Sequence, residues 1–172
     1  MISLRRAYSG NAAAVFDNKV IGVNDQGGVM GVVRSEKENC PVARKRILVV
    51  EDEQEIRKLL SFHIGISGYE VASVSDGAEA VKSIKEHIPD LIVLDILLPR
   101  MNGWELLDCL RREFGGADIP VIVVSALDEV GDKLRAFSSG AEDYLTKPFS
   151  PRELIMRIQK ILQRCGERGI KK

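Results

Sequence analysis

Four apolar runs of the sequence are each followed by polar side chains that can do chemistry. Carboxylates follow two of these runs, a hydroxyl group follows the third and an ammonium group follows the fourth: Glu51 with Asp52, Asp95, Ser125 and Lys147. If the runs are parallel strands, their carboxyl ends lie at one edge of a sheet, which is where open α/β sheets bind ligands. The spacing therefore predicts a single polar cluster built from four strand ends.

Three carboxylates in one cluster require a cation. Two like unit charges at 4 Å repel each other by about 4 kcal/mol at an effective dielectric constant of 20. Mg²⁺ would relieve this repulsion, since it binds one or two carboxylates together with water and a phosphate oxygen. A carboxylate oxygen could then attack a phosphoryl group, while Lys147 and Ser125 hold the phosphoryl oxygens. The residue types predict a site that accepts phosphate.

The apolar runs are typical of strands buried on both faces, and amphipathic segments separate them. Asp76 with Glu79, and Ser150 with Pro151, provide helix start signals. Five strands alternating with five helices predict an α/β fold with a doubly wound, flavodoxin-like parallel sheet. A 2-1-3-4-5 strand order would bring the first, third, fourth and fifth strand ends around one crevice. The predicted strands are 47–50, 70–74, 91–94, 121–124 and 144–146.

Three further expectations concern one of the strands and two of the helices. The run at 70–74 is more polar than the others, which indicates an edge strand. Gly68 is predicted to end the first helix. The segment 128–138 is only weakly apolar, so we expect its helix to be loosely held.

Residues 1–45 carry the weakest pattern in the chain. Short apolar runs at 19–23 and 29–33 flank a turn-forming stretch and predict a hairpin, which on its own is marginal in water. We expect residues 1–45 to be a flexible or weakly structured N-terminal extension, followed by a domain over 46–165 and a polar tail over 166–172.

The composition limits the function classes. The 172 residues carry 25 basic and 25 acidic side chains, and this net charge of zero argues against general nucleic-acid binding. No apolar stretch has the length of a membrane span or of a secretory signal. Cys40, Cys109 and Cys165 have no paired spacing, which suits a reducing compartment. We expect a cytoplasmic protein without direct contacts to nucleic acid or membrane.

The sequence over residues 46–165 closely resembles the receiver domain of two-component response regulators. The stretch 98–103 is similar to the family's loop after the phosphorylated strand. The other matched positions are the acidic pair Glu51 and Asp52, the phosphoacceptor Asp95, the switch hydroxyl Ser125, the switch aromatic Tyr144, and Lys147 with Pro148, whose peptide bond is usually cis in the family.

The resemblance implies that a histidine kinase or a phosphotransfer protein donates a phosphoryl group to Asp95 in a reaction that needs Mg²⁺. The implied metal ligands are Glu51, Asp52, Asp95 and the backbone carbonyl of Leu97. Ser125 would then move to the phosphate, and Tyr144 would rotate into the vacated space. The surface of the fourth helix, fifth strand and fifth helix would change and be recognised by a downstream protein. The chain would be a regulatory phosphoacceptor and not an enzyme.

The switching surface carries charges that resemble the dimer face of receivers from winged-helix transcription regulators: Lys133, Asp143, Glu153 and Arg157. Ser138 and Gln159 depart from that pattern, because an opposite-charge pair is common at these positions. A homodimer that forms on phosphorylation is therefore a hypothesis.

Other phosphate-handling families fit the sequence less well. A flavodoxin-type protein should have a loop rich in Ser, Thr and Gly at 51–53, a P-loop protein needs GxxxxGK, and a haloacid-dehalogenase-like phosphatase needs an acid in place of Leu97. Three outputs stay open: a single-domain regulator that acts through protein contacts, a phosphorelay intermediate, and the receiver of a longer DNA-binding transcription regulator. The complete acidic set disfavours a degenerate receiver that works without phosphate.

Overall fold

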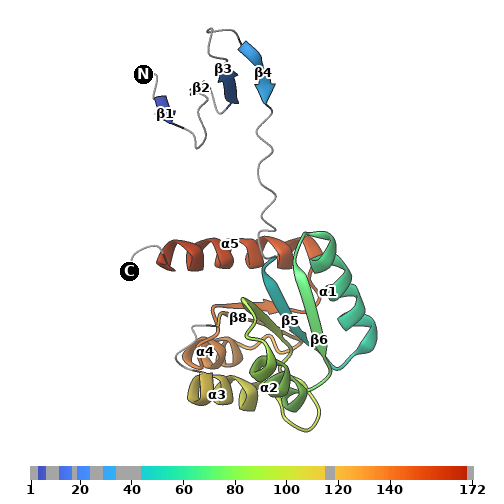
Figure 1. Cartoon of the computed structure of the whole chain (residues 1–172). Helices are drawn as coiled ribbons and strands as arrows, with labels where there is room; N and C mark the ends of the chain where they lie inside the picture. Colours follow the sequence, from blue (N-terminus) through green and yellow to red (C-terminus); the bar gives the residue numbers. More distant parts are fainter. Residues whose placement is uncertain are drawn as a thin grey trace. The chain divides into compact units, whose positions relative to one another are not determined.

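Figure 1 shows a computed structural model of the chain, which divides into two compact units, Met1–Ala43 and Arg44–Lys172. The structure describes the backbone of residues 4–6, 12–16, 19–23, 29–33, 44–114 and 119–169, and the side chains within 44–114 and 119–166.

The first unit is an antiparallel sheet with the strand order β1-β2-β3-β4. Its strands are β1 (Leu4–Arg6), β2 (Ala12–Phe16), β3 (Lys19–Val23) and β4 (Val29–Val33). The hairpin predicted from the two short apolar runs is confirmed as β3 and β4. The sequence did not predict β1 and β2, because alanine and arginine carry little β-propensity. The flexibility expected of residues 1–45 stays a prediction.

The second unit contains a five-stranded parallel sheet in the order β6-β5-β7-β8-β9. Its strands are β5 (Arg46–Val50), β6 (Glu70–Val74), β7 (Leu91–Leu94), β8 (Val121–Ser125) and β9 (Asp143–Thr146). This is the predicted 2-1-3-4-5 order, so the doubly wound α/β fold is confirmed. β6 is an edge strand, as its mixed polarity indicated.

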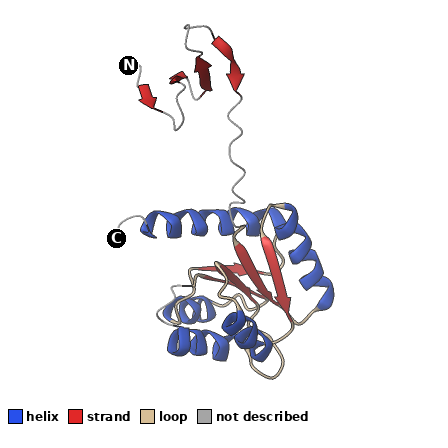
Figure 2. Ribbon diagram, in the orientation of Figure 1, coloured by secondary structure: helices blue, strands red, loops and turns tan. Residues whose placement is uncertain are grey.

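Helices cover both faces of this sheet (Figure 2). They are α1 (Gln54–Ile66), α2 (Gly77–Glu86), α3 (Gly103–Phe114), α4 (Val130–Ser138) and α5 (Pro151–Gly169). Successive residues of β5 enter opposite cores, because side chains alternate between the two faces of a strand. Leu48 and Val50 pack in the core with α2 and α3, whereas Ile47 and Val49 pack in the core with α1 and α5.

The helix ends follow the local sequence signals. Gly68, with a φ of 95°, lies just beyond the C-cap of α1, a left-handed position that glycine adopts without a steric penalty. Asp76 caps α2 by accepting hydrogen bonds from the backbone N–H groups of Ala78 and Glu79. α5 continues to Gly169 and so extends into the segment predicted to be a polar tail.

α4 buries few of its side chains, in line with its weakly apolar sequence, and its loose attachment stays a prediction. Ala136 is the buried residue of this helix, and Leu134 and Phe137 are exposed. Within the described segments, the structure contains no helix that is long and apolar enough to cross a membrane.

Candidate functional site

The acidic residues come together at the carboxyl ends of β5 and β7. One carboxylate oxygen each from Glu51, Asp52 and Asp95 lies within 4.8 Å of the other two. The strand register explains this arrangement, since Val50 pairs with Leu94 and the acidic residues follow directly. Glu51 and Asp95 are buried and Asp52 is exposed. The structure thus brings together the three carboxylates of the predicted cluster.

Lys147 lies between the two buried carboxylates. Its Nζ is 2.8 Å from Glu51 Oε2 and 2.6 Å from Asp95 Oδ2. Burial lowers the pKa of Lys147, but the hydrogen bonds to Asp95 and Glu51 outweigh this effect and leave the pKa raised. The ammonium group is therefore charged at neutral pH. The peptide bond between Lys147 and Pro148 is cis, as the resemblance implied.

The two carboxylate oxygens of Glu51 differ in their contacts. Oε2 accepts the hydrogen bond from Lys147, but Oε1 is buried and has no hydrogen-bond partner. Burial raises the pKa of Glu51, the hydrogen bond from Lys147 opposes this rise, and the charge of Asp95 adds to it. A buried oxygen without a partner is costly, and a cation would supply one. The three carboxylates also form the oxygen donor set that a hard divalent cation prefers.

Asp95 is held by backbone contacts on both sides. Its N–H donates to the Val50 carbonyl at 2.9 Å, and the Leu97 N–H donates to Asp95 Oδ1 at 2.9 Å. A Cβ atom on Gly103 would lie 2.6 Å from the Asp95 carbonyl oxygen, so the first turn of α3 packs directly against this residue. The carboxylate therefore projects from a fixed stretch of chain. The metal-binding role of the Leu97 carbonyl stays a prediction.

Ser125 and Tyr144 both contact Leu127, in the loop between β8 and α4. Ser125 is fully buried, and its Oγ accepts a hydrogen bond from the Leu127 N–H at 3.3 Å. Tyr144 is also buried, and its hydroxyl donates to the Leu127 carbonyl at 2.8 Å. Burial raises the pKa of Tyr144, and a hydrogen bond with Ser125 opposes the rise. Leu127 thus connects the predicted switch hydroxyl and switch aromatic.

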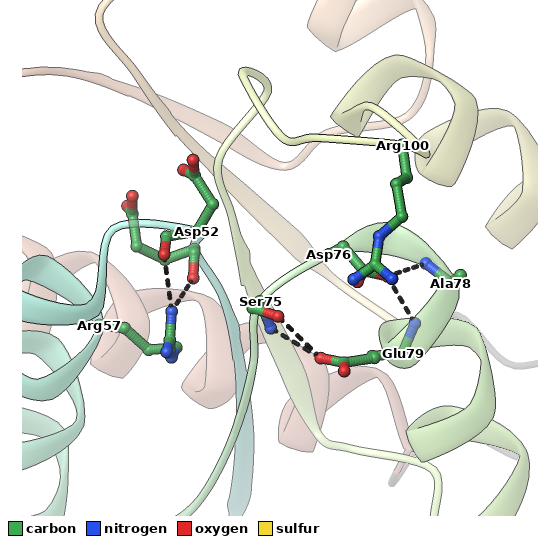
Figure 3. A network of polar contacts seen from close by, with 8 residues as sticks. Asp52, Arg57, Ser75, Asp76, Ala78, Glu79 and Arg100 are labelled. Carbon is green, nitrogen blue, oxygen red and sulfur yellow. Dashed lines mark hydrogen bonds and ion pairs between the residues drawn. The ribbon is translucent and has the colours of Figure 1, made fainter.

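Two arginines that were not predicted as site residues hold the loops around the acidic cluster (Figure 3). Arg57 Nη1 donates to the carbonyl oxygens of Glu51 and Asp52, at 2.7 and 2.9 Å. Arg100 forms an ion pair with the buried carboxylate of Asp76. The sequence contained a hint of the role of Arg57. A cation near the N-terminus of a helix opposes the helix dipole, so an arginine there is unusual. Arg100 lies in the stretch 98–103 that resembles the family's loop, but its ion pair with Asp76 depends on the folded loop, where its backbone is left-handed with a φ of 63°.

Three of the four charges predicted for a dimer face pair with one another within the chain, namely Asp143, Glu153 and Arg157. Arg157 Nη1 lies 2.7 Å from Asp143 Oδ2, and its Nη2 lies 2.8 Å from Glu153 Oε1. This closed network connects β9 and α5. An intermolecular ion pair of Arg157 would compete with these contacts.

Comparison with known proteins agrees with the geometry of the site. A family model for the response regulator receiver domain matches residues 47–159. The chain is 46% identical over 120 residues to the alkaline phosphatase synthesis transcriptional regulatory protein PhoP of Bacillus subtilis, with 70% of this chain and 49% of that protein covered. It is 40% identical over 126 residues to the phosphate regulon transcriptional regulatory protein PhoB of Klebsiella pneumoniae, with 73% and 55% covered. The chain therefore spans about half the length of these relatives.

Solved structures of receiver domains are similar to this chain as well. The receiver domain of the Francisella response regulator 1452 has a TM-score of 0.67 and 36% identity, and the match covers 70% of this chain and 98% of that domain. A CheY-like receiver domain protein from Methanospirillum hungatei has a TM-score of 0.68 and 28% identity, with 73% and 98% covered. The matched residues 47–159 make up more than half of the chain and contain the whole acidic cluster. The chain belongs to the family of response regulator receiver domains.

Proposed function

We propose that the chain is a phospho-accepting response regulator, which receives a phosphoryl group on Asp95 from a histidine kinase or a phosphotransfer protein. The observation that carries this proposal is the acidic cluster, whose three carboxylate oxygens lie within 4.8 Å of one another. Lys147 lies beside it, 2.6 Å from Asp95 Oδ2. Membership of the receiver family supports the class of phosphoryl donor.

The site fits Mg²⁺. Its ligands would be Glu51, Asp52, Asp95 and the backbone carbonyl of Leu97, and the orphaned oxygen Glu51 Oε1 supports a cation at this position. When bound, Mg²⁺ would neutralise the carboxylates and balance the charge on the phosphoryl oxygens.

The chain's own residues account for the transfer. A carboxylate oxygen of Asp95 attacks the phosphorus, and the bond from phosphorus to the donor imidazole breaks with its electron pair left on the nitrogen. The product is an acyl phosphate on Asp95. The Lys147 ammonium and the Ser125 hydroxyl then donate hydrogen bonds to the phosphoryl oxygens. Because the chain assists only its own modification, we class it as a regulatory phosphoacceptor and not as an enzyme.

The switch begins at Ser125. A hydroxyl drawn to the phosphate gives up its contact with Leu127, to which Tyr144 is also bound. The loop before α4 is then released, and α4 can shift because it buries so little of its surface. A downstream protein would recognise and bind the changed surface of α4, β9 and α5.

We also propose the bounds of the receiver domain and the cellular location of the protein. The receiver would extend over residues 46–165, with 1–45 as an extension and 166–172 as a polar tail; the family match over 47–159 supports the central range. A cytoplasmic location suits Cys109 and Cys165, which are free thiols in the structure.

Incubation with acetyl phosphate and Mg²⁺ will add one phosphoryl group to the wild-type chain and none to Asp95→Asn. The amide of asparagine is not a nucleophile that forms an acyl phosphate, while its shape preserves the fold. Intact-mass spectrometry measures the adduct, and circular dichroism checks that the variant is folded. A wild-type adduct that forms equally well without Mg²⁺, or an adduct on Asp95→Asn, would contradict the proposed site.

The relatives favour a second candidate for the output, namely the receiver of a DNA-binding transcription regulator. PhoP and PhoB are transcriptional regulatory proteins by name, and this chain matches about half of each. Such an output would use phosphorylation to bring two receivers together through α4, β9 and α5.

Phosphorylation will convert the monomer to a dimer if this second candidate holds. The expected reason is a movement of α4 that exposes a matching apolar and charged face, with Arg157 exchanging one internal partner for an intermolecular one. Sedimentation velocity before and after treatment with acetyl phosphate and Mg²⁺ measures the change, with Asp95→Asn as the control. A chain that is phosphorylated and stays monomeric would remove the dimer and favour output through other protein contacts.

A further inference from the structure

The loop that carries the acidic pair has a support of its own. β5 ends at Val50 and α1 begins at Gln54, so the acidic pair lies outside both elements. Glu53, the N-cap of α1, makes no side-chain capping hydrogen bond. Arg57 instead reaches back from α1, and its Nη1 donates to both carbonyl oxygens of the acidic pair, at 2.7 and 2.9 Å.

These two hydrogen bonds determine which way the acidic pair faces. They hold the carbonyl groups of Glu51 and Asp52 toward α1. Figure 3 shows the guanidinium of Arg57 on one side of the chain and the carboxylate of Asp52 pointing away from it. One carboxylate oxygen each of Glu51 and Asp52 comes within 4.8 Å of a carboxylate oxygen of Asp95. The orientation of the peptide groups and the convergence of the carboxylates are therefore linked.

Helix stability does not explain an arginine at this position. A cation near the N-terminus of α1 opposes the helix dipole, so Arg57 does not favour the helix. Its positive charge also repels any other cation near the acidic cluster. A residue that opposes the helix dipole and yet makes two hydrogen bonds to the preceding loop points to a role in that loop and not in the helix.

We propose that Arg57 is a positioning residue that holds the acidic pair in the arrangement a divalent cation requires. This inference rests on the proposed function, because it assumes that the acidic cluster binds Mg²⁺. Arg57 acts through the backbone carbonyl groups of Glu51 and Asp52 and does not touch the cation. Positioning and charge predict opposite effects of its removal: loss of positioning weakens cation binding, whereas loss of positive charge alone strengthens it.

Arg57→Met will raise the Kd for Mg²⁺ about 10- to 100-fold, the usual effect of removing a residue that orients metal ligands. Arg57→Gln will fall between the wild type and Arg57→Met, because its amide retains a donor for a carbonyl group but carries no charge. Mg²⁺ alone is the probe, and the Kd follows from the rise of the thermal unfolding midpoint with Mg²⁺ concentration. Intact mass after treatment with acetyl phosphate gives a second readout at limiting and saturating Mg²⁺.

Lys58→Met is the matched control. Lys58 is the next residue of α1, is exposed, and contacts Glu55 at 3.9 Å, so its removal changes the net charge equally without touching the loop. We expect the Kd of Lys58→Met for Mg²⁺ to stay within about twofold of the wild-type value, as is usual for a screened surface charge. If Arg57→Met does not fold in the absence of Mg²⁺, Arg57→Gln provides the comparison.

Each outcome has a distinct meaning. An unchanged or tighter Kd in the Arg57 variants overturns the inference and leaves a purely electrostatic role. Equal weakening in Lys58→Met overturns it as well, because the effect would then not depend on the hydrogen bonds that Arg57 makes to the loop. A wild-type chain that shows no response to Mg²⁺ contradicts the cation site of the proposed function itself, and the inference falls with it.

Discussion

Lys147→Met will destabilise the protein by about 3 to 5 kcal/mol at neutral pH without Mg²⁺, the usual cost of removing one partner from a buried ion pair. The variant leaves Glu51 and Asp95 buried with no ammonium group between them. Their side chains have little access to water, so solvent cannot replace the lost charge. Urea denaturation of the wild type and the variant measures the difference. Phosphorylation by acetyl phosphate should fall in the same variant, since Lys147 would hold a phosphoryl oxygen.

The destabilisation will be smaller at pH 5 than at pH 7.5. The pKa of Glu51 is raised in the folded protein, so ionisation of Glu51 costs stability as the pH rises above its unfolded pKa and through its folded pKa. Removal of Lys147 takes away the hydrogen bond that opposes this rise and moves the folded pKa further up. The pKa of Lys147 is itself raised, so in the wild type its contribution is complete at both pH values.

Lys85→Met provides the control for this experiment. Lys85 Nζ lies 2.9 Å from Glu113 Oε2, almost the geometry of the Lys147 pair, but both side chains are exposed. Water and salt screen such a pair, so the unfolding midpoint should hardly change. Equal losses in the Lys147 and Lys85 variants, or a Lys147 loss that does not depend on pH, would show that buried charge is not the cause.

Gly103→Ala will destabilise the protein by about 1 to 3 kcal/mol, the usual cost of inserting an atom into a packed interior. A Cβ atom at this position would lie 2.6 Å from the Asp95 carbonyl oxygen and 2.6 Å from the Ile96 Cα. Both contacts are with backbone, which cannot rotate away as a side chain can. The strain therefore displaces Asp95, the proposed phosphoacceptor. We expect the rate of phosphorylation to fall even where the variant is folded, as measured by intact mass over time.

Gly65→Ala is the matched control for Gly103→Ala. Gly65 lies in α1, and a Cβ atom there would meet nothing within 4 Å beyond the backbone of its own helix, so the same substitution enters open space. Alanine is the better helix former, and a gain of about 0.5 kcal/mol is expected. A Gly103 variant with wild-type stability and a wild-type rate would show that the backbone of Asp95 tolerates displacement.

The sequence by itself determined the fold and the members of the acidic cluster. Apolar runs of four or five residues, each ended by a polar side chain, are local patterns, and a parallel sheet places all their carboxyl ends at one edge. Gly68 and Asp76 likewise indicated the end of α1 and the start of α2 through preferences of single residues. Such features need no knowledge of distant contacts, which is why periodicity and resemblance were sufficient.

The tertiary structure alone decided how these residues meet. Lys147 contacts carboxylates that are 96 and 52 positions away in the sequence, and no local pattern shows that it bridges the two buried ones. The unpartnered oxygen of Glu51, the closeness of Gly103 to Asp95 and the ion pair of Arg100 also depend on segments that become neighbours only on folding. Side-chain types and the positions of the strands can be read from local patterns, but strand pairing, distances and burial result from packing the whole domain.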